Sequence, residues 1–114
     1  MSLIDAAQEL SPTDVVASSE SVSIAGRKLQ LNVDANAVTA ADIWLLEPKT
    51  GVVAAGDLVT LPAPFLDTAC PSGWSAELRR IAETKFSVLI PGHGDPMSRA
   101  QFLTYERAFD ALLA

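Results

Sequence analysis

Two residues with metal-binding side chains, Asp57 and His93, each follow an apolar run that predicts a buried strand. Asp57 comes after Gly56 at the end of the run at residues 52–55, and His93 follows the run at residues 86–90. If these two strands are parallel and joined by a helix, both side chains lie at one edge of the sheet. A carboxylate and an imidazole at such an edge are able to share a divalent metal ion.

Each residue also has a purely structural interpretation. A lone histidine in a Pro-Gly-His-Gly turn can hydrogen-bond within that turn, and a Gly-Asp pair is common where a strand ends. Both interpretations stay open on the sequence alone. The other loop acids, Asp42, Asp67 and Asp95, are expected to hold turns or face solvent.

Strands come first in the chain and helices later. Apolar and polar residues alternate on both sides of Ala-Gly-Arg at residues 25–27, which indicates a hairpin. A Pro- and Gly-containing charged turn at residues 47–51 separates two more apolar runs and indicates a second hairpin. The expected strands are residues 21–24, 28–33, 43–46, 52–55 and 86–90.

The expected helices are residues 4–10, residues 74–84 and a last helix that begins after Ser98. Ser72 is a candidate N-cap for the middle helix, and Ser98 with Gln101 has the spacing of a capping box. Residues 58–73, with three prolines, are expected to form a loop. Trp44, Trp74 and the Tyr105/Phe109 stripe are expected to pack in the core.

Composition narrows the function classes. The chain has 114 residues, enough for one domain, and its net charge of −6 argues against nucleic acid as a partner. No run of eighteen apolar residues predicts a membrane span, and the start of the chain has no secretory leader, so a cytoplasmic location is expected. Cys70 is the single cysteine and is expected to be buried.

The order of these features resembles the C-terminal half of a metallo-β-lactamase-fold hydrolase. The resemblance runs over residues 22–114 and rests on the order of two motifs and the elements around them. Gly-Asp-Leu at residues 56–58 follows a hairpin; a helix and a strand come next, and Pro-Gly-His-Gly at residues 91–94 follows that strand. It implies an α/β (α+β) fold, namely half of an αββα sandwich, with a mixed β-sheet and two or three helices on one face. Residues 1–21 would then be a helix, a turn and a lead-in to this half-domain.

The resemblance also implies a site. Asp57 matches the aspartate that bridges two metal ions, usually zinc, and His93 matches a histidine that binds the second ion. In the family the metals hold a hydroxide that attacks an ester, amide or thioester carbonyl, because a bound metal lowers the pKa of water and polarises the carbonyl.

Two departures from the family weaken this expectation. The chain has no His-x-His-x-Asp-His motif, and Val38 occupies the position of a third family histidine. Valine has no lone pair, and a zinc site needs three or more protein ligands. We therefore expect zinc to bind weakly or not at all, and the chain to be an inactive portion of a hydrolase. The alternative is a non-catalytic half-sandwich that serves as an interaction or oligomerisation module.

A half-sandwich has an apolar sheet face with nothing packed on it. Such a face is larger than a monomer usually exposes. The expected cover is another copy of the chain or the N-terminal half that the resemblance implies.

Overall fold

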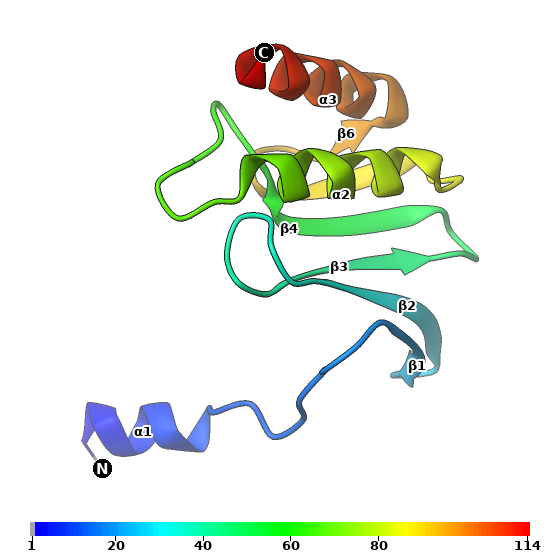
Figure 1. Ribbon diagram of the computed structural model, residues 1–114. Helices are drawn as coiled ribbons and strands as arrows, with labels where there is room; N and C mark the ends of the chain where they lie inside the picture. Colours follow the sequence, from blue (N-terminus) through cyan, green and yellow to red (C-terminus); the bar gives the residue numbers. More distant parts are fainter. Residues whose placement is uncertain (1) are drawn as a thin grey trace.

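The computed structural model describes residues 2–114, which form a six-stranded sheet and three helices (Figure 1). The elements in chain order are α1 (Leu3–Glu9), β1 (Glu20–Ile24), β2 (Arg27–Asp34), β3 (Asp42–Glu47), β4 (Val52–Thr60), α2 (Pro71–Glu83), β5 (Val88–His93), β6 (Met97–Ser98) and α3 (Arg99–Leu113).

The sheet is mixed, as the sequence predicts. Its strands lie in chain order from β1 to β6, and every neighbouring pair is antiparallel except β4 and β5, which are parallel. Helix α2 makes the crossover between these two strands. Strands β2, β4 and β5 therefore run in one direction, and their carboxyl ends meet at one edge of the sheet.

The two faces of the sheet differ in their cover. Register places Leu46 opposite Val53, and Val53 opposite Leu89, on the face that the helices cover; all three side chains are buried. Leu45, Ala54 and Ile90 are paired in the same way on the other face; Leu45 and Ala54 are half-buried and Ile90 is 44% exposed.

Helices α2 and α3 lie together on one side of the sheet (Figure 1). The aromatic residues of α3 pack against this core: Phe102 meets Phe86 with ring centroids 5.4 Å apart, and Phe109 meets Trp74 at 4.9 Å. The capping box predicted at Ser98 is confirmed, because its hydroxyl accepts from the N–H of Gln101.

Helix α1 has no buried residue and stands away from the sheet at the end of an extended segment (Figure 1). Ser2 caps it through a capping box with Asp5. No helix within residues 2–114 is both long enough and apolar enough to cross a membrane.

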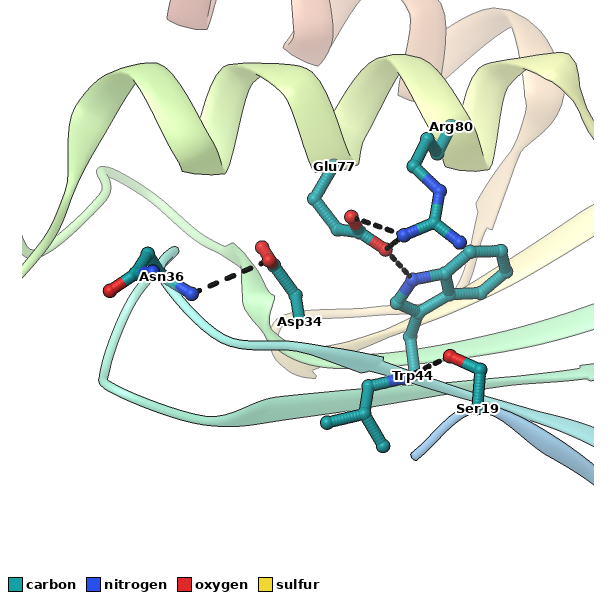
Figure 2. Close-up of polar contacts among 7 residues, drawn as sticks. Ser19, Asp34, Asn36, Trp44, Glu77 and Arg80 are labelled. Atoms are coloured by element: carbon teal, nitrogen blue, oxygen red, sulfur yellow. Dashed lines mark hydrogen bonds and ion pairs between the residues drawn. The ribbon is translucent and has the colours of Figure 1, made fainter. Parts of the chain in front are cut away.

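One carboxylate is buried between α2 and the sheet (Figure 2). Glu77 is almost fully buried; its carboxylate accepts from Trp44 Nε1 at 2.5 Å and from Arg80 Nη1 at 2.9 Å. Buried charges require such partners. The core positions predicted for Trp44 and Trp74 are confirmed, and their indole N–H groups both donate, Trp74 to the carbonyl of Leu58 at 2.8 Å.

Strand β6 is absent from the sequence prediction, and three elements have boundaries that differ from the prediction by more than one residue. Strand β4 does not end at residue 55 but continues to Thr60, because Leu58 and Val59 are fully buried and Thr60 pairs with β5. Strand β5 covers residues 88–93 rather than 86–90. Helix α2 begins at Pro71, a favoured first helical residue, so its N-cap is Cys70 and not Ser72.

Candidate metal centre

Asp57 lies at an irregularity in β4. Gly56 pairs with Pro91, and the next pair joins Thr60 to His93, so β4 advances four residues while β5 advances two. Gly56 has φ of 56°, a conformation that glycine adopts without strain. This bulge turns the chain at Asp57, as bulges near functional sites often do.

The side chains of Asp57 and His93 lie side by side at the edge where β4 and β5 end. His93 Nε2 is 3.2 Å from Asp57 Oδ1, and the two side chains are 66% and 59% exposed. The strand topology thus brings the two residues together, as the sequence predicts. Their role as metal ligands stays a prediction.

Gly92 makes this approach possible. A Cβ at residue 92 would lie 2.6 Å from the carbonyl of Gly56 and 2.8 Å from Asp57 Oδ1, so no larger residue fits without movement of the backbone. Beyond the strand, Gly94 has φ of 121°, and the N–H of Leu61 donates to the carbonyl of His93 at 3.0 Å. The end of β5 is therefore fixed against the end of β4.

Val38 lies in the loop between β2 and β3, at the same edge of the sheet as the carboxyl ends of β4 and β5. Its side chain is buried in the hydrophobic core. Its carbonyl accepts from the Thr68 hydroxyl at 3.2 Å, and the neighbouring Ala37 carbonyl accepts from the N–H of Cys70 at 2.7 Å. A valine in this place contributes packing and no metal ligand.

The other three aspartates considered in the sequence analysis form no ion pair or side-chain hydrogen bond with Asp57 or His93 among the residues that the structure describes. Asp42 holds the turn before β3, as predicted, by accepting from the N–H of Thr39 at 2.8 Å. Asp67 and Asp95 are exposed loop acids.

The prediction that Cys70 is buried is wrong. Its side chain is exposed because Cys70 takes the N-cap position of α2. Hydrogen bonds from the backbone N–H of Gly73 and from the Ser72 hydroxyl hold the pKa of the Cys70 thiol below its usual value. The sequence contained a signal for this environment, namely Pro71 at a first helical position directly after the cysteine.

Asp57 and His93 do not by themselves fit a resident zinc ion. Within residues 2–114, no three histidine, cysteine, aspartate or glutamate side chains gather closely enough to hold a metal. Zinc sites have at least three protein ligands. The pair therefore supplies part of a coordination shell, and any further ligand must come from elsewhere.

Solved structures share this fold. A metallo-beta-lactamase from Pontibacter korlensis matches with a TM-score of 0.74 and 19% identity, over 94% of this chain and 54% of its own. The metallo-beta-lactamase IND-7 matches with a TM-score of 0.66 and 19% identity, over 85% of this chain and 49% of its own. A metallo-beta-lactamase family protein from Thermus thermophilus gives a TM-score of 0.70 and 16% identity, over 97% of this chain and 41% of its own.

The fold is thus half of a metallo-β-lactamase fold, and the chain spans about half the length of these structures. No protein-family model and no curated protein matches the sequence.

Proposed function

We propose that this chain provides one part of the metal centre of a metallo-β-lactamase-superfamily hydrolase and is inactive by itself. The observation that supports the proposal is the 3.2 Å contact between His93 and Asp57 at the carboxyl ends of two parallel strands. By the sequence resemblance, these two residues match a metal-binding histidine and a bridging aspartate of the family.

The expected inactivity of the isolated chain follows from its small number of metal ligands. Two side chains leave a zinc ion short of the three protein ligands that catalytic sites contain, and Val38 adds none. For a protein that also supplied the other ligands, we propose a small-molecule ester or amide as substrate. That proposal rests on the resemblance and not on a pocket in this chain.

Titration of the isotopically labelled chain with Zn²⁺, followed by NMR, tests the proposal. We expect weak, fast-exchanging binding that shifts the signals of Asp57 and His93 together, and no hydrolysis of ester or β-lactam substrates. His93→Ala should abolish the shifts at Asp57, whereas Asp95→Ala, which removes a neighbouring exposed acid, should leave them. Zinc-dependent shifts elsewhere, or hydrolysis that survives His93→Ala, would contradict the proposal.

A second role, a non-catalytic interaction module, is favoured by a separate observation. The face of the sheet away from α2 and α3 is apolar, and Ile43, Val88 and Ile90 on it are 39–44% exposed. Apolar burial is the main driving force of protein association. Under this role the Asp57/His93 pair is a remnant, and zinc produces no change at either residue.

A further inference from the structure

We infer that Thr60 is a positioning residue of the candidate site, which holds Asp57 against His93 by bonding to the backbone of both residues. The contact that it holds is a property of this chain without any metal. The importance of that contact for a metal centre rests on the proposed function.

The bulge in β4 interrupts the regular pairing of backbone groups close to Asp57. Strand β4 pairs with β3 at residues 52–54 and then continues to Thr60. On the side of β5, the register is irregular between Gly56 and Thr60. Backbone N–H and C=O groups that leave a ladder in a largely buried segment require hydrogen bonds from other groups. The groups that provide these bonds therefore fix the backbone at Asp57.

Thr60 provides one of these hydrogen bonds and pairs with β5 at the same time. Its hydroxyl donates to the carbonyl of Asp57 at 2.9 Å, which ties together the four residues from Asp57 to Thr60. Its backbone is the ladder partner of His93, and the N–H of the following residue, Leu61, donates to the His93 carbonyl at 3.0 Å. Thr60 thus connects the backbone of Asp57 to the backbone of His93.

Two aromatic side chains from the helices hold the same segment against the core. Trp74 of α2 donates its indole N–H to the carbonyl of Leu58 at 2.8 Å, and both side chains are fully buried. The Tyr105 hydroxyl of α3 accepts from the N–H of Thr60 and donates to the Leu58 carbonyl, both at 3.4 Å. These bonds anchor Leu58 and Thr60, and the Thr60 hydroxyl extends the anchor to the exposed Asp57.

Thr84 is a natural control, because it makes the same local bond in another place. Its hydroxyl donates to the carbonyl of Ile81, three residues earlier, at 2.7 Å. Thr84 and Thr60 are both half-buried. Thr84 precedes the amino end of β5, however, whereas Thr60 pairs at the carboxyl end of β5, where His93 lies. Loss of the Thr84 hydroxyl should therefore cost stability without moving the site.

NMR of the metal-free full chain tests the inference through the nuclear Overhauser effect between the β protons of Asp57 and the His93 ring protons beside Nε2. Thr60→Val, which keeps the branched shape, and Thr60→Ala both lack the hydroxyl, and we expect the signal to be lost in each. Thr60→Ser keeps the hydroxyl and should retain the signal. Thr84→Val should also retain it, while its unfolding midpoint in urea falls by a similar amount to that of Thr60→Val, because each loses one hydroxyl–carbonyl bond.

Three results would overturn the inference. They are a signal of wild-type strength in folded Thr60→Val or Thr60→Ala, loss of the signal in Thr60→Ser, and an equal loss in Thr84→Val. The test is independent of the zinc titration because it uses no metal. A chain that binds no zinc would contradict the proposed function and leave the positioning role of Thr60 intact.

Discussion

His93 Nε2 lies 3.2 Å from Asp57 Oδ1, and the residue that permits this contact, Gly92, has no side chain of its own to offer a metal or a substrate. The two side chains come from parallel neighbouring strands that α2 connects. Their proximity is thus a property of the backbone at the bulge in β4, where the two strands approach each other more closely than a Cβ allows.

Gly92→Ala should separate the pair. The added methyl group meets the Gly56 backbone at 2.6 Å, so we expect a loss of about 1–3 kcal/mol in unfolding free energy, as for overpacked sites. Gly26→Ala is the control, since φ of 76° strains the backbone there but no atom lies within 4 Å. Denaturant unfolding measures both losses, and only Gly92→Ala should move the His93 ring signals in NMR. Unchanged ring signals would show that the contact does not depend on Gly92.

Because Trp44 donates a hydrogen bond to the buried Glu77 carboxylate, we expect Trp44 to contribute more to the free energy of unfolding than Trp74. Trp44→Phe removes a hydrogen bond to a charged group, worth about 1.5–3 kcal/mol, whereas Trp74→Phe removes one to a neutral carbonyl, worth about 1 kcal/mol. Both indoles are buried, so the packing change is similar. Urea unfolding should therefore show the larger loss for Trp44→Phe. Equal losses would mean that Glu77 gains nothing from this donor.

Stability in acid should depend on Glu47. Hydrogen bonds from Arg27 and Thr50 lower the pKa of this carboxyl from 4.5 to about 2. Because the folded pKa is the lower one, the stabilisation is complete above about pH 4.5 and is lost as the pH falls toward 2.

Arg27→Gln should flatten the pH dependence of the unfolding midpoint in that range. Lys28→Gln removes a charge at the next position, where residues 2–114 provide no ion pair, and should keep the wild-type dependence. If both variants behave alike, net charge and not the Arg27–Glu47 contact governs acid stability.

The sheet and the pair at its edge were predictable because each rests on local patterns. Alternating and continuous apolar runs indicate the strands, and a strand followed by Gly-Asp or Pro-Gly-His places both side chains where parallel strands end. The continuation of β4 to Thr60 was not predictable in this way, because Gly56 and Asp57 read as the end of a strand. Only the pairing of Thr60 with His93 across the bulge makes residues 58–60 part of the sheet.

The exposure of Cys70 was missed for a similar reason. Cysteine is among the most buried residue types, and the prediction followed this general tendency rather than the neighbouring Pro71. The Pro71 that follows it starts a helix and leaves the cysteine at the N-cap, outside the core.

The need for glycine at residue 92 could not be predicted from the local sequence. The close approach of a Cβ at residue 92 to Gly56 depends on two segments that are far apart in the chain.

Zinc affinity of Val38→His tests the central claim, that Asp57 and His93 are two ligands of an incomplete metal centre. If Val38 occupies the third ligand position, a histidine there should raise zinc affinity by at least about tenfold in equilibrium dialysis, because it completes a three-ligand set. The gain should disappear in Val38→His/His93→Ala. A gain in zinc affinity that survives His93→Ala would contradict the claim, because the added zinc would then bind without His93.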